Sequence, residues 1–65
     1  MKRPATPIVR EITPQEYALR QYAVAYDRME SRERDYRAAG LPILAAGARA
    51  LADRLLRAYQ IELTA

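Results

Sequence analysis

The stretch that decides the fold is Ala38-Ala39-Gly40-Leu41-Pro42, in the second half of the chain. Glycine commonly ends a helix because it adopts the left-handed backbone conformation without a steric penalty. Proline is favoured in the first turn of a helix, where its missing N–H has no intrahelical partner. A connection of about three residues forces two helices to lie side by side and antiparallel. The sequence therefore predicts an all-α helical hairpin.

The start of the first helix is marked by Thr13-Pro14-Gln15-Glu16. Threonine is a favoured N-cap, a glutamate three residues later completes a capping box, and the proline falls at the first helical position. We therefore expect one hairpin over residues 13–65, with a helix at 14–39, a turn at 40–41 and a second helix at 42–63.

Residues 1–12 form a separate N-terminal arm, because Pro4 and Pro7 disfavour a helix there. The alternation of Ile8, Arg10 and Ile12 predicts a short extended strand. A strand followed by helices is similar in element order to ribbon-helix-helix DNA-binding proteins, which place such strands in the major groove. The arm could instead add a strand to a partner's sheet, or remain an unstructured tail.

The composition narrows the possible chemistry. The chain of 65 residues has no cysteine, no histidine and only two glycines. It therefore lacks the thiolate, which can act as a nucleophile or a zinc ligand, and the imidazole, which is the commonest general base and metal ligand. Two isolated glycines do not form a phosphate-binding loop. We predict no enzymatic activity, no catalytic residue, no metal, no cofactor and no small-molecule substrate.

The charge and hydropathy indicate where the protein works. Eleven Lys and Arg against eight Asp and Glu give a net charge of +3, which permits but does not require contact with nucleic acid. The longest apolar stretch, residues 40–48, is far shorter than the ~20 residues of a membrane span. No apolar segment follows the basic N-terminus as it does in a signal peptide. We therefore expect a cytoplasmic protein that does not enter a membrane.

Apolar residues recur at helical spacing in both halves of the chain. The stripe of the first helix consists of Ala18, Leu19, Tyr22, Ala25, Tyr26, Met29 and Tyr36, and that of the second of Leu44, Ala48, Leu51, Ala52, Leu55, Tyr59 and Leu63. The apolar arc of the second helix is wider than one neighbouring helix can cover. We therefore expect a homodimer that forms a four-helix bundle, or else a hairpin docked on a different protein. The predicted dimer core is Leu44, Leu51, Leu55 and Tyr59.

Two acidic residues, Glu33 and Glu62, fall on these apolar stripes. A carboxylate on a buried stripe is expected to pair with a cation of the opposite helix. Counting residues from the turn predicts the ion pairs Glu33–Arg49 and Glu62–Arg20.

The leading functional hypothesis is a protein-binding adaptor or inhibitor that occupies a surface of a larger protein. The predicted partner-binding residues are Ile8, Val9, Tyr17, Val24 and Arg28. Tyr17 has an alternative role, because it stands where it could form a hydrophobic staple with Ile12. A short chain rich in Arg and Ala also suggests a phage or another mobile element of a GC-rich bacterium, with the host cytoplasm as its location.

Two alternatives remain open. The first is a dimeric nucleic-acid-binding regulator that uses Arg10, Arg49, Arg54 and Arg57. Binding to phosphates would weaken steeply as salt rises, whereas an apolar protein interface would respond little. The second alternative is a structural subunit of a larger assembly, which predicts oligomers beyond a dimer.

Overall fold

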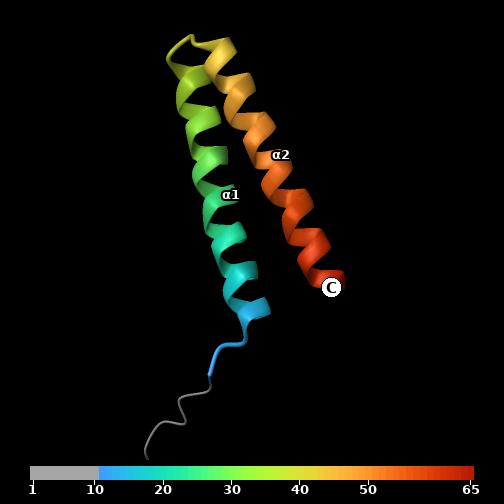
Figure 1. Cartoon of the computed structure of the whole chain (residues 1–65). Coiled ribbons are helices and arrows are strands. Elements are labelled where there is room, and N and C mark those ends of the chain that lie inside the picture. Colours follow the sequence, from blue (N-terminus) through green and yellow to red (C-terminus); the bar gives the residue numbers. More distant parts are fainter. Residues whose placement is uncertain (1–10) are drawn as a thin grey trace, which may run out of the picture.

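The computed structural model describes residues 11–65, which form two helices, α1 (Pro14–Ala38) and α2 (Pro42–Thr64). The helices pack against each other and run antiparallel (Figure 1). The predicted helical hairpin is confirmed for this part of the chain. α1 ends one residue earlier, and α2 one residue later, than the sequence predicted. The predicted strand at residues 8–12 lies outside the described residues apart from its last two, Glu11 and Ile12, which have no regular secondary structure.

The capping box at the start of α1 is present. The backbone N–H of Glu16 donates to Oγ1 of Thr13 at 3.1 Å, and the backbone N–H of Thr13 donates to Oε1 of Glu16 at 3.5 Å. Each bond satisfies a backbone donor that the first turn of a helix leaves without a partner.

The turn is a Schellman motif. Gly40 has a φ of +73°, a left-handed conformation that only glycine adopts without strain. Its N–H donates to the carbonyl of Arg37 at 3.1 Å, and the N–H of Leu41 donates to the carbonyl of Tyr36 at 2.8 Å. Pro42 follows at the first position of α2. These bonds close α1 and reverse the chain within three residues.

The open end of the hairpin is joined by one long-range hydrogen bond. Nε2 of Gln15, in the first turn of α1, donates to the backbone carbonyl of Glu62 at 2.6 Å. This carbonyl belongs to the last turn of α2 and also accepts the backbone N–H of Ala65 at 3.3 Å. The Gln15 bond therefore connects the two helices at their free ends.

The core between the helices is small. In residues 11–65, the buried apolar side chains are Ala45, Ala48 and Ala52, and no larger apolar side chain is buried. The tyrosines of α1 that face these alanines are half-buried. Large residues on α1 therefore meet small ones on α2, which lets the helix axes approach closely.

Candidate functional site

A charged cluster joins the helices near the turn. Glu33 is buried on the stripe of α1 that faces α2. Its Oε1 accepts a hydrogen bond from Arg49 at 3.3 Å, and its Oε2 lies 2.8 Å from a guanidinium nitrogen of Arg37, one turn away on α1. The predicted Glu33–Arg49 ion pair is thus confirmed. Glu33 avoids the penalty of an unpaired buried charge because both carboxylate oxygens are engaged.

Arg49 makes further contacts around this pair. It donates to the Tyr26 hydroxyl at 3.2 Å and to Oδ1 of Asp53 at 3.2 Å, and its guanidinium carbon lies 5.7 Å from the centre of the Tyr26 ring. The Tyr26 hydrogen bond, aided by the carboxylates of Asp53 and Glu33, raises the pKa of Arg49 against the opposing effect of desolvation. Arg49 is therefore held against α1 as a cation whose charge is already compensated.

The predicted ion pair Glu62–Arg20 was wrong. No such pair forms within residues 11–65, and it is Gln15 that reaches Glu62. Gln15 shares a side of α1 with Tyr22, whereas Arg20 lies five residues after Gln15 and is exposed. Five residues are nearly one and a half helical turns, so Arg20 projects away from α2.

One side of the hairpin is predominantly apolar, and we call it the leucine face. It contains a groove of about 240 Å³ whose lining includes Met29, Arg32, Tyr36, Leu44, Gly47 and Leu51. Leu44 is 50% exposed and Leu51 is 48% exposed, and Ile43 at the end of the groove is 86% exposed. This side of the hairpin therefore leaves several large apolar side chains in contact with solvent.

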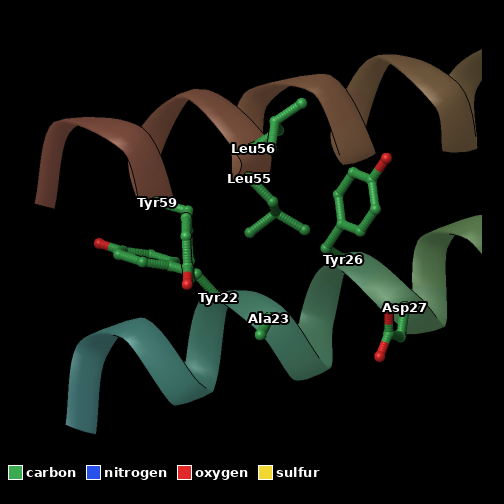
Figure 2. A pocket seen from close by; sticks show the side chains of 7 residues that line it. All are labelled: Tyr22, Ala23, Tyr26, Asp27, Leu55, Leu56 and Tyr59. Atoms are coloured by element: carbon green, nitrogen blue, oxygen red, sulfur yellow. The ribbon is translucent and has the colours of Figure 1, made fainter. Parts of the chain in front are cut away.

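A second hollow, which we call the tyrosine pocket, has a volume of about 150 Å³. It is lined by Tyr22, Ala23, Tyr26, Asp27, Leu55, Leu56 and Tyr59. Figure 2 shows Leu55 pointing between the helices, with Tyr22 and Tyr59 together at one end and Tyr26 at the other. By helical spacing, Ala23 and Asp27 lie on the side of α1 opposite Arg32, so this pocket opens away from the leucine face. Its apolar walls and one carboxylate suit an apolar side chain beside a cation.

The structure describes three of the predicted partner-binding residues, because Ile8 and Val9 lie outside the described residues. Tyr17 is 59% exposed and Val24 is 49% exposed. They are seven residues apart in α1 and therefore lie on the same side of the helix, about two turns from each other. Val24 and the exposed Arg28 line a shallow hollow with neighbouring polar side chains.

The predicted dimer core is divided between two sides of the hairpin. Leu44 and Leu51 lie on the leucine face, but Leu55 and Tyr59 are half-buried against α1 and line the tyrosine pocket. The sequence reasoning missed this pocket. One signal could have located it, since an antiparallel hairpin places Tyr22 and Tyr59 at about the same distance from the turn.

The predicted nucleic-acid-binding arginines are also in different places. Arg10 lies outside the described residues. Arg49 faces α1 and its carboxylates, whereas Arg54 and Arg57 are exposed on α2. The structure therefore does not bring Arg49 together with the other two.

Neither helix within residues 11–65 is both long enough and apolar enough to span a membrane. The same part of the chain contains no cluster of three or more acidic, His or Cys side chains placed to hold a metal ion. No protein-family model, curated protein sequence or solved structure matches the chain.

Proposed function

We propose that the protein is a non-enzymatic binding module which, as a homodimer, occupies a surface of a larger partner protein. The observation that carries this proposal is the distribution of apolar side chains. The hairpin buries three alanines, while Leu44, Leu51 and Leu56 remain 41–50% exposed. A chain of this size and this small a core usually requires an additional partner or subunit to be stable.

The tyrosine pocket supports the partner-binding part of the proposal. Tyrosine is enriched in binding sites because its ring contributes apolar contact and its hydroxyl remains available to water or to a polar group. Leu56, on the rim, is exposed and supplies further apolar contact, and Asp27 adds a negative charge. The partner surface that fits is an apolar side chain next to Lys or Arg.

The test is affinity capture from the host lysate with the tagged protein and two variants. Leu56→Glu places a charge on the rim of the pocket, and Ala50→Glu places the same charge on an exposed position of α2. A partner that the wild type captures in stoichiometric amount after nuclease treatment should be lost with Leu56→Glu and retained with Ala50→Glu. Circular dichroism checks that both variants are helical. Equal capture by all three proteins would contradict the proposed site.

A second candidate, nucleic-acid binding, is favoured only by the exposed Arg54 and Arg57. Under this alternative, nuclease would abolish the capture, and the affinity would fall by nearly one power of ten per phosphate contact for each tenfold rise in salt. Replacing both arginines by Gln would abolish it as well. Either the nuclease result or the salt result would replace our first proposal.

A further inference from the structure

α2 carries two apolar seams, and the hairpin uses one of them. The seam that faces α1 contains Ala45, Ala48, Ala52, Leu55 and Tyr59, spaced three and four residues apart. The second seam places Leu44, Gly47 and Leu51, spaced three and four residues apart, on the leucine face, and Ala58 lies on the same side of α2 two turns after Leu51. A helix with one apolar neighbour needs only one such seam, and a second indicates a second neighbouring helix.

α1 carries a second seam on the same side of the hairpin. Tyr22, Ala25, Met29, Arg32 and Tyr36 are spaced three and four residues apart, and three of them line the groove of the leucine face together with residues of α2. Both helices therefore lack a neighbour on the same side. This arrangement is that of half a four-helix bundle.

Gly47 has no role within the hairpin. It does not have a positive φ, and a Cβ added to it would meet no atom within 4 Å. Glycine inside a helix is less favourable than alanine, so the hairpin alone would be more stable with alanine there. Gly47 forms a notch between Leu44 and Leu51, where a group from outside the hairpin can approach the backbone of α2 closely.

We propose that a second copy of the chain packs on the leucine face, about a two-fold axis parallel to the helices. α1 of each copy then lies antiparallel to α2 of the other, at the same distance from the turn. The aliphatic stem of Arg32 from one copy crosses the notch at Gly47 of the other. This inference rests on the homodimer proposed above and adds its interface and register.

The sizes of the residues that meet in this register are complementary. Tyr22 of one copy faces Ala58 of the other, and Arg32 faces Gly47, so a large residue meets a small one each time. Met29 faces Leu51 of the other copy, which adds an apolar pair. The leucine face is thus complementary to itself, as a two-fold interface requires, and this favours a second copy over an unrelated protein.

The available area agrees with a stable dimer. Residues 42–57 of α2 extend for about 24 Å, and two adjacent helices are about 20 Å wide. Pairing two such faces buries on the order of 1,000 Å² in total, which is about the lower limit for a specific interface.

Cross-linking between single-cysteine variants tests the register, because the chain has no cysteine of its own. We expect a refolded mixture of Arg32→Cys and Gly47→Cys to form, on mild oxidation, a disulfide-linked dimer whose intact mass contains one copy of each. Ala50→Cys, on the exposed side of α2, should not link to Arg32→Cys. Gly47→Cys alone should link poorly, since diagonal helices lie about 13 Å apart when neighbours are ~9 Å apart.

The possible outcomes separate this inference from the proposed homodimer. A monomer at all concentrations in analytical ultracentrifugation would overturn both. A dimer in which Gly47→Cys links to itself and not to Arg32→Cys would overturn the interface proposed here and leave the homodimer standing.

Filling the notch provides a second test that does not depend on disulfide formation. Gly47→Leu should raise the dissociation constant of the dimer at least tenfold, whereas Ala46→Leu, the neighbouring position outside the groove, should leave it unchanged. Both variants should retain helical circular dichroism. A dimer of unchanged affinity in Gly47→Leu would show that the notch faces solvent.

Discussion

The Glu33–Arg49 pair links two positions that are sixteen residues apart in the sequence. It lies beside the buried alanines of α2, which form a strip of small apolar residues. An alanine core offers little to fix how far one helix slides along the other, because its small side chains give shallow grooves. A carboxylate that pairs with one arginine on each helix has one favoured geometry. The pair therefore sets the relative position of the helices more than it adds to the strength of their packing.

Glu33→Gln tests this role at the level of one residue. The substitution keeps the size of the side chain and removes the charge that faces Arg37 and Arg49, and it should lower the free energy of unfolding by about 1 kcal/mol. Glu30→Gln is the matched control, because Glu30 is only half-buried and lies 3.8 Å from Arg49, so its effect should stay within ~0.5 kcal/mol. Urea unfolding at a fixed protein concentration measures both. If both substitutions lowered the free energy of unfolding by the same amount, the burial of Glu33 would make no difference to stability.

The ends of the elements depend on single residues that act on the backbone. Thr13 is the N-terminal cap of α1, and Gly40 adopts the left-handed conformation just after the end of α1. Neither residue contributes to the apolar contact between the helices. Their effect is to stop the helix at a defined place, so that the chain enters and leaves α1 at fixed angles.

Thr13→Ala should lower the free energy of unfolding by about 1 kcal/mol, because the N–H of Glu16 loses its acceptor. Thr13→Ser keeps a hydroxyl and should be nearly neutral. Thermal unfolding followed by circular dichroism distinguishes the two variants. A loss of stability with Ser as large as that with Ala would show that the hydroxyl is not the relevant group.

Gly40→Ala should lower the free energy of unfolding by about 1–2 kcal/mol, since the added Cβ strains the left-handed backbone although no neighbouring atom obstructs it. Gly40→Asn should cost less, because asparagine tolerates this conformation better. Chemical unfolding of the three proteins gives the order Gly, Asn, Ala. Any other order would contradict the role assigned to the φ of +73°.

The whole molecule is expected to be stable only to the extent that it associates. If folding and dimerisation are coupled, the midpoint of thermal unfolding rises with protein concentration. Leu51→Asp, which places a charge on the leucine face, should remove this dependence and lower the midpoint by several degrees, measured from about 1 to 100 μM. A midpoint that does not change with concentration in the wild type would mean that the hairpin folds as a monomer.

The local features of the fold could be predicted from the sequence, and the arrangement of its faces could not. Gly40 and Pro42 determine a turn through their own backbone preferences, and the capping box involves residues three positions apart. By contrast, the partner of Glu62 depends on the rotation of α1 about its own axis, which turned Gln15 and not Arg20 towards α2. The same rotation separates the predicted dimer-core leucines, because it decides which of two overlapping seams meets α1.

The three-residue turn also affects the kinetics of folding. Contacts next to the turn close short loops, whereas the bond between Gln15 and Glu62 spans 47 positions. Because loop closure becomes less favourable with length, the helices should pair first near the turn and last at their free ends, with a low contact order and a fast folding rate. Amide hydrogen exchange should therefore be slowest around Ala48 and fastest towards Ile61. The free ends would then open and close many times for each complete unfolding of the hairpin.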